Sequence, residues 1–419
     1  MTSEATRTET LSRTETPSRT AGVARIRTTL AVSVAVQVIG LLFSIALSSI
    51  AFVCAGAACA VLAAWRPRDV FRRNGLEPWI LAFIAASALS VVFAVHPVES
   101  LVDARRILLY LLVIFIPLAF DREKILRRFV LALALVAALH SVVEIVMYYG
   151  EGRDRLSFFQ HYMTSAGIKM LVLLVVLPQA LDRGVARTER VLYLLASVVL
   201  MIALVLTQTR SSWIGFAAGM IVLGIAAYRS VFVIMLALVV AFVLLAPGGL
   251  MERATHMFAT SQSGATDGAV AANTVASNQY RMRMWETGWR MFLSDPFTGV
   301  GEGRMHEQYR TWVPEAVKNE GGHLHNTYVH ILATHGAPGL LALLALFFAV
   351  LRVEWRTFRM AGRTPAGGLA LGAFAATIGF LVNGMAEYNF GDHEVMVLVW
   401  SVLGIALAVR AQLRVIAVT

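Results

Sequence analysis

Long apolar runs follow one another along most of this chain of 419 residues, and the loops between them are short and mostly basic. A helix needs about 20 apolar residues to cross the hydrocarbon core of a bilayer. Because 58% of the residues are hydrophobic and 15% are charged, the composition excludes a soluble globular protein, a disordered chain and a disulfide scaffold. The runs predict an all-α polytopic membrane protein with about twelve spans. Their approximate limits are 28–47, 49–65, 77–95, 103–120, 127–148, 167–182, 190–207, 211–228, 230–246, 334–351, 366–387 and 393–410.

The charged loops set the orientation that we expect for these helices. Most of the Lys and Arg residues in short loops fall on the side of the N-terminus, and cytoplasmic loops carry such an excess. We therefore expect both termini in the cytoplasm. The expected regions are a disordered cytoplasmic tail at 1–25, spans 1–9 at 26–246, a long outer loop with interfacial helices at 247–333, and spans 10–12 with the C-terminus at 334–419.

The net charge and the cysteines add no separate function. The net charge is +10, but the basic residues lie between apolar runs and so indicate membrane topology rather than a nucleic-acid partner. Cys54 and Cys59 lie in one apolar run and point to different helix faces, so we expect no disulfide and no metal site there.

The outer loop at 247–333 is too long for a simple connector, and loops of this length are usually functional. Its 260–278 part is rich in small residues and predicts a mobile flap. Helical periodicity returns from Tyr280 to Leu293, with Arg283 and Arg290 on a solvated side. The opposite side carries Arg281, Trp285, Trp289 and Phe292. An arginine on that apolar side needs a counter-charge or a wet cleft, so Arg281 is a candidate site residue.

Histidines gather where the outer loop ends. Four of the ten histidines, His323, His325, His330 and His335, fall in this segment. We expect Asn326 to cap a short helix, Gly336 to end it and Pro338 to open the next span. His325 and His330 lie five apart with no carboxylate between them, which argues against zinc. His325 is as compatible with a catalytic as with a structural role, and Glu387 or Asp392 in the last outer turn could orient it.

Arg210 follows Thr209 in the outer turn between two spans, and we expect Ser211 or Ser212 to cap the next helix. A cation near a helix N-terminus opposes the helix dipole unless an anion is also present. The backbone N–H groups and the guanidinium together would bind a phosphate. The alternative is an arginine that extends to the membrane interface.

Other polar residues on the outer side complete the candidates. Arg153, Arg155, Gln160 and His161 lie in one outer loop, where Glu151 and Asp154 could neutralise an arginine, and Lys169 could reach the same face. His140 and Glu144 lie one turn apart inside the fifth span and are either functional or a contact between helices. The glycines at 299–303 lack the strand and helix of a dinucleotide site, and the sequence has no Walker motif, so we expect no nucleotide cofactor.

Three groups of residues in this order resemble the O-antigen ligase and O-antigen polymerase superfamily of bacterial envelopes. They are Thr209-Arg210-Ser211, then Arg281, Trp285, Phe292, Pro296 and Gly299-Val300-Gly301, and finally His325-Asn326 with Leu332, Gly336 and Gly339-Leu340. The resemblance implies a GT-C-like glycosyltransferase in the bacterial inner membrane, with its site and its large loop, between spans 9 and 10, in the periplasm. It implies transfer of a glycan from undecaprenyl diphosphate without a metal or another cofactor, and with inversion.

The resemblance also implies roles for the candidate residues. His325 and Arg210 would be catalytic, and Arg281, Arg153, Arg155, Gln160, His161 and Asn326 would bind the diphosphate donor. The chain length looks most like a ligase, whose acceptor is the lipid A-core oligosaccharide, and we assume a monomer. The alternatives are an O-antigen polymerase, a protein O-oligosaccharyltransferase and, in another class, a lipid-linked glycan transporter that uses His140 and Glu144, or a passive scaffold.

Overall fold

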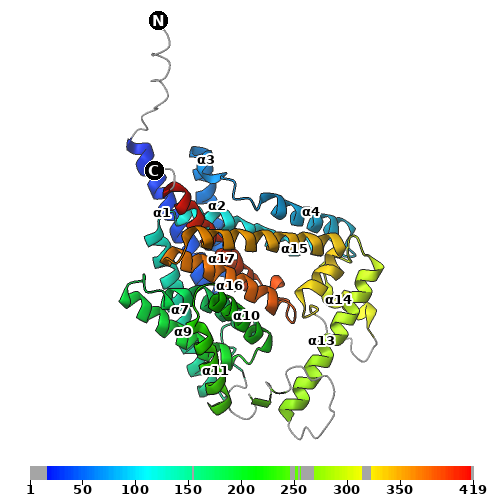
Figure 1. Cartoon of the computed structure of the whole chain (residues 1–419). Helices are drawn as coiled ribbons and strands as arrows, with labels where there is room; N and C mark the ends of the chain where they lie inside the picture. Colours follow the sequence, from blue (N-terminus) through cyan, green and yellow to red (C-terminus); the bar gives the residue numbers. More distant parts are fainter. Residues whose placement is uncertain are drawn as a thin grey trace.

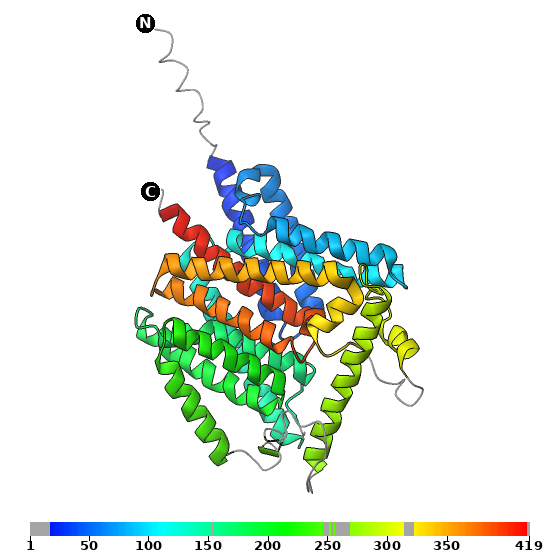
Figure 2. The ribbon, with the colours of Figure 1, turned by 45° about the vertical axis from the view of Figure 1, so that its right-hand side comes forward.

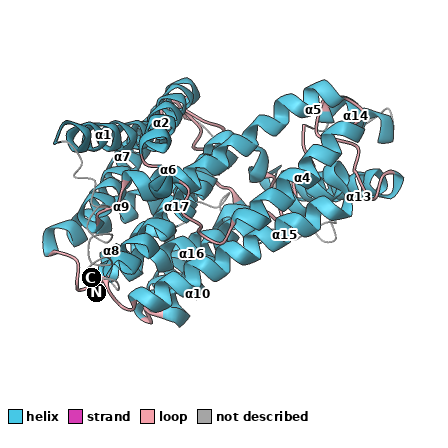
Figure 3. Ribbon diagram, turned by 90° about the horizontal axis from the view of Figure 1, so that it is seen from above, coloured by secondary structure: helices cyan, strands magenta, loops and turns pink. Residues whose placement is uncertain are grey.

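The structure, a computed structural model, describes residues 17–152, 155–245, 251–252, 255, 269–313 and 322–416. Within these ranges the chain forms helices and loops and no strand (Figure 3). The first half contains α1 (Pro17–Gly40), α2 (Ile45–Trp65), α3 (Pro67–Val70), α4 (Glu77–Phe93), α5 (Pro97–Ala104), the 3₁₀ helix η1 (Arg105–Leu111), α6 (Leu112–Ala119), α7 (Glu123–Gly150), α8 (Tyr162–Leu181) and α9 (Arg187–Leu206). The second half contains α10 (Arg210–Ala226), α11 (Ser230–Leu245), α13 (Ala269–Ser294), α14 (Met305–Trp312), α15 (Thr327–Ala361), α16 (Pro365–Asn383), η3 (Asn389–Gly391) and α17 (His393–Ile416).

The predicted polytopic, all-helical class is confirmed. In the described residues, 8 helices are long and apolar enough to cross a membrane: α1, α2, α7, α8, α9, α15, α16 and α17. Three shorter apolar helices, α4, α10 and α11, coincide with three further expected spans. The run expected at 103–120 divides into η1 and α6. The count of twelve spans therefore stays a prediction.

Helix α8 lies at the centre of the bundle. In the most apolar 18-residue stretch of α8, 94% of the residues are buried. The corresponding value for α2 is 33%, and apolar side chains of α2 face outward. Small residues allow the central helices to approach closely, because a Cβ added at Gly215 of α10 would lie 2.5 Å from the carbonyl oxygen of Gly379 in α16. This dense packing of α8, α10 and α16 provides a rigid support for the ends of these helices.

Several expected boundaries were wrong. Helix α1 begins at Pro17, so part of the expected tail is helical, while residues 1–16 lie outside the described ranges. The first two spans divide near Ser44 because its hydroxyl caps α2 by accepting from the Leu47 N–H. The expected flap at 260–278 is helical from Ala269 onward, and its first part, 260–268, is not described. Neither Ser211 nor Ser212 caps α10, since Thr209 occupies the N-cap position.

Helix α15 changes direction at Gly336, which has φ 67° and ψ −173°. Pro338 has no N–H, so the carbonyl of Thr334 loses its helical donor. The carbonyls of Ala333 and Thr334 instead accept from the N–H groups of Val300 and Gly301, each at 3.0 Å. The sequence predicted that a short helix ends at Gly336 and that a new span opens at Pro338, and the structure has a kink at this place. The kink ties the segment before α14 to the first part of α15.

The two ends of the bundle differ in what they contain. The start of α1, the end of α17 and α3 lie at one end, whereas α13 and α14 project at the opposite end (Figures 1 and 2). The loop between α16 and α17, which holds Glu387, and the start of α15, which holds His325, meet at this second end. Cys54 and Cys59 are both free, as expected.

Candidate active site

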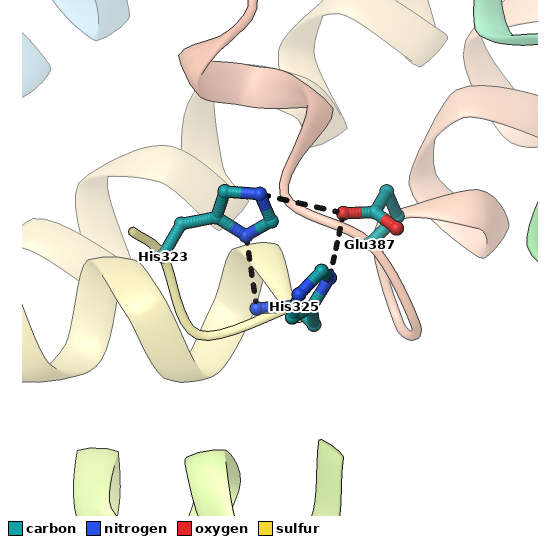
Figure 4. Close-up of side chains that lie close together, drawn as sticks. All are labelled: His323, His325 and Glu387. Atoms are coloured by element: carbon teal, nitrogen blue, oxygen red, sulfur yellow. Dashed lines mark hydrogen bonds and ion pairs between the residues drawn. The ribbon is translucent and has the colours of Figure 1, made fainter. Parts of the chain in front are cut away.

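Glu387 is the centre of the candidate site. It lies in the loop after α16 and its side chain is almost completely buried. Its Oε1 lies 3.0 Å from Nδ1 of His325 and 3.9 Å from Nε2 of His323 (Figure 4). Its Oε2 lies 3.5 Å from Nη2 of Arg281, which projects from α13. One carboxylate thus joins three segments that are far apart in the sequence.

The start of α15 fixes the position of His325. Asn326 caps this helix as predicted, since its Oδ1 accepts from the N–H groups of Tyr328 and Val329. The Thr327 N–H donates to the Gly384 carbonyl at 2.8 Å, which joins α15 to the loop of Glu387. His325 itself has φ 46°, a left-handed conformation that costs about 1–3 kcal/mol for a residue with a Cβ. The surrounding contacts therefore hold its imidazole in a defined place.

Charge determines which nitrogen of His325 carries the proton. Burial alone would raise the pKa of Glu387, but its hydrogen bond to His325 and the nearby His323 and Arg281 outweigh burial and lower it to about 2. An ionised carboxylate only accepts hydrogen bonds, so Nδ1 of His325 must donate. In a neutral imidazole the lone pair is then on Nε2, the arrangement that a general base requires.

Three arginines line a small cavity beside this cluster. The cavity has a volume of about 70 Å³, and Arg155, Arg210 and Arg281 are all part of its wall. Arg210 donates to Oδ1 of Asn278 in α13 at 2.8 Å, and Arg155 lies 4.4 Å from the ring centre of Tyr162. Arg281 borders both this cavity and Glu387, so the structure brings Arg210, Arg281 and His325 together at one end of the bundle. Such a group of guanidiniums is suited to a phosphate or diphosphate.

Of the other predicted site residues, some lie near Glu387 and some do not. His161 caps α8, and burial lowers its pKa, with Glu387 and Arg155 among the charges that act on it. Gln160 lies outside the arginine cavity and donates to the Leu41 carbonyl at 3.2 Å. Asp392 accepts from the Thr164 hydroxyl at 3.0 Å, and it is Glu387, not Asp392, that contacts His325. Arg153 lies outside the described residues.

A second, half-buried charged group is joined to this site through Tyr388, the residue after Glu387, and it was not predicted from the sequence. Glu302 accepts from the Tyr388 hydroxyl and from Arg106, the latter at 3.0 Å. The ring of His330 stacks on that of Tyr388 with a centroid separation of 3.7 Å. Burial opposes ionisation of Glu302, but His330 and Arg106 lower its pKa far below the usual range. The glycines around Glu302 were noticed in the sequence, yet no pattern pointed to the carboxylate between them.

His323, His325 and Glu387 could also hold a metal ion. Their donor atoms all lie within 4.8 Å of one another, although the spacing of the histidines argued against zinc. Arg281 lies 3.5 Å from the same carboxylate and adds a positive charge that competes with a cation. The geometry is therefore compatible with a three-ligand site, whereas the charge distribution favours an anion nearby.

His140, Glu144 and Lys169 form a separate network between α7 and α8. Nζ of Lys169 donates to Oε2 of Glu144 at 2.6 Å, and Nδ1 of His140 lies 3.5 Å from the same oxygen. All three side chains are buried, and the described contacts do not join them to Glu387. The Lys169 partner was not expected from the sequence, and it supplies the contact between helices.

The fold and this group of residues define a polytopic membrane protein with an imidazole, a carboxylate and guanidiniums at one end of a helical bundle. Residues 195–344 match a family model described as O-antigen ligase. Over 275 residues the chain is 22% identical to the O-antigen ligase of Escherichia coli (strain K12), a match that covers 61% of this chain and 60% of that protein. The expected resemblance to the O-antigen ligase superfamily is thus confirmed. Arg210, Arg281 and His325 lie within the family match, and Glu387 lies beyond it.

Proposed function

We propose that this protein is an O-antigen ligase, a GT-C-like glycosyltransferase with twelve spans. It transfers a glycan from undecaprenyl diphosphate to a hydroxyl of the lipid A-core oligosaccharide. The site faces the periplasm, both termini lie in the cytoplasm of a bacterium, and the protein acts in the inner membrane as a monomer. The superfamily resemblance supports the reaction class, and the basic loops at the opposite end of the bundle support the orientation.

The observation that supports this proposal most directly is the hydrogen bond between His325 and Glu387 beside a cavity walled by three arginines. The acceptor hydroxyl attacks the anomeric carbon as its proton passes to Nε2 of His325. The bond between that carbon and the diphosphate oxygen breaks, and its electron pair leaves with the diphosphate. Attack from the face opposite the leaving group inverts the anomeric centre.

Arg210 and Arg281 stabilise the charge that develops on the departing diphosphate, with Arg155 at the rim of the cavity. Asn326 maintains the start of α15, and His161 lies close enough to be affected by the charge of Glu387. Glu387 holds the His325 ring in one tautomer and stabilises the imidazolium that forms. These side chains supply the acid–base and electrostatic steps themselves, so the proposed reaction requires no metal.

The test is transfer by the purified protein from a lipid-linked donor to a lipid A-core acceptor. His325→Ala should lower the rate by about 10²–10⁴, the typical contribution of a positioned base, while the protein remains in the membrane. His306→Ala is the matched control, because this histidine of α14 has no described contact with Glu387. Transfer at the wild-type rate by His325→Ala would refute the assignment.

An O-antigen polymerase or a protein O-oligosaccharyltransferase uses the same donor and differs in its acceptor. A strain without the protein distinguishes a ligase from a polymerase. Complete loss of capped lipopolysaccharide supports the ligase, and retention of one repeat supports the polymerase. A protein acceptor would instead appear as loss of glycan from protein hydroxyls.

A lipid-linked glycan transporter is the alternative in another class, and His140 and Glu144 were its best support. Their pairing with Lys169 gives them a role in helix packing, which weakens that alternative. The same assay separates the two classes, since a transporter would move the donor without forming a glycosidic bond.

A further inference from the structure

A large cavity with charged walls lies at the end of the bundle away from the candidate active site. Its volume is about 600 Å³, in the range of small-molecule sites. It opens between α6 and α17, near α1 and α3. Helix α17 begins beside the candidate site at His393 and reaches this cavity at Arg410, which puts the two sites about 26 Å apart along the helix.

The rim of this cavity is basic. Five arginines line it, from three separate parts of the chain: Arg27 of α1, Arg72 and Arg73 after α3, and Arg410 and Arg414 of α17. A membrane protein gathers basic residues at its cytoplasmic loops for topology alone, but topology does not require them to converge on one hollow. The convergence is a property of the fold.

Only two carboxylates in the lining oppose these charges. Asp69 pairs with Arg27 at 3.0 Å and with Arg72 at 3.1 Å, and Asp121 pairs with Arg27 at 2.6 Å. Among the described residues, Arg73 and Arg414 have no carboxylate within ion-pair distance. Arg410 donates through Nη1 to the Asn74 carbonyl at 3.1 Å, and its buried Nε has no hydrogen-bond partner there. The rim therefore has cationic groups available to an anion.

The floor of the cavity is apolar. Val113, Ile114, Pro117 and Leu118 of α6 form one side, and Leu407 of α17 forms the other. A free phosphate would gain nothing from such a wall, whereas an acyl chain would be removed from water by it. A basic rim above an apolar floor at the end of membrane-spanning helices is suited to a lipid with a charged head group.

We propose that this cavity binds an anionic phospholipid, with its head-group phosphate among Arg73, Arg410 and Arg414 and its acyl chain between α6 and α17. The bound lipid would hold the end of α17 against α3 and α6. The site is separate from the proposed transferase site, and its test does not require the protein to be active.

The experiment measures lipid binding to the purified full chain in a neutral detergent, by native mass spectrometry and by thermal unfolding. The probes are phosphatidylglycerol and phosphatidylcholine with the same acyl chains. Phosphatidylglycerol should remain bound and raise the unfolding temperature, and phosphatidylcholine should do neither. In the double variant Arg410→Gln/Arg414→Gln the affinity for phosphatidylglycerol should fall about thirty-fold. This is the loss expected when two basic residues that contact an anionic lipid are neutralised.

Arg363→Gln is the matched control, because it removes one positive charge from an exposed position between α15 and α16 that does not line the cavity. If the double variant fails to fold, Arg73→Gln replaces it, since Arg73 is exposed. Equal loss of binding in Arg363→Gln would overturn the proposal. So would equal stabilisation by inorganic phosphate, which would indicate a simple anion site, and so would equal binding of phosphatidylcholine.

Discussion

Replacing Glu387 by Gln tests the central claim about the site, because the side chain keeps its size and loses only its charge. The lowering of the Glu387 pKa from its ordinary 4.5 to about 2 corresponds to about 3 kcal/mol that the folded protein gains from the ionised form. This stabilisation of the folded state is fully present above pH 4.5, the ordinary pKa of a glutamate, and is lost as the pH falls toward 2. Near neutral pH, Glu387→Gln should therefore lower the free energy of unfolding by up to about 3 kcal/mol.

The same substitution should affect transfer more than binding. An amide can present either its oxygen or its N–H₂ group to His325, so the tautomer with the lone pair on Nε2 is no longer enforced. We expect kcat to fall by about 10²–10⁴, the full contribution of the base, with a smaller change in KM. Single-turnover transfer by purified protein in lipid nanodiscs measures both quantities.

Asp392→Asn is the matched control for Glu387→Gln. Asp392 is a half-buried carboxyl in the same loop region, but it contacts Thr164 rather than His325. Its substitution should change kcat by less than Glu387→Gln does. If Glu387→Gln transfers at the wild-type rate while folding normally, the argument that this carboxylate orients the base is wrong.

Further predictions concern charge, backbone and metal. Arg210→Lys should lower transfer severely in the same assay, because a point charge cannot replace the two-pronged contact of a guanidinium with a phosphate. Gly299→Ala should reduce the yield of folded protein, since its φ is +67° and an added Cβ would lie 2.2 Å from the Thr334 carbonyl carbon, whereas Gly150→Ala has open space. Burial raises the pKa of Asp392 to about 7, so the unfolding temperature should fall as the pH rises from about 4 to 7, and Asp392→Asn should remove this slope. Transfer should be unchanged by a chelator, and a loss restored by zinc would assign His323, His325 and Glu387 to a metal.

The helices could be predicted from the sequence because each apolar run has to satisfy its own backbone inside a membrane, and a helix does so locally. Within the described residues each expected span overlaps helical structure, and the break at Gly336 followed from a glycine and a proline two positions apart. Boundaries were less accurate where a polar side chain decides the start of a helix. Ser44 is the example, since its hydroxyl caps α2 and starts that helix at Ile45 instead of the expected 49, and the apolar pattern contains no information about caps.

The candidate site could be predicted only in part. His325, Arg210 and Arg281 were identifiable because a histidine at a helix entrance and arginines on apolar or helix-start positions are unfavourable without a partner. The sequence could not decide whether Glu387 or Asp392 contacts His325. The path of the loop after α16 decides which carboxyl faces α15, and local sequence does not contain this tertiary relation. Glu302 and the pairing of Lys169 with Glu144 were missed for the same reason, since the partners lie 86 and 25 residues apart.

The position of the site follows from how a membrane bundle is built. The central helices are closely packed by small residues, and the candidate site lies where helices end and backbone groups are unsatisfied. The kink of α15 has two effects on the site. It releases the carbonyls of Ala333 and Thr334, which fix the segment that carries Glu302, and it leaves the first turns of α15 free to place His325 beside Glu387. A helix without Gly336 and Pro338 would satisfy its own carbonyls and would have no means of holding that segment. The same glycine and proline that interrupt the span therefore hold Glu302 in place, and Glu302 accepts from the hydroxyl of Tyr388, the residue that follows Glu387.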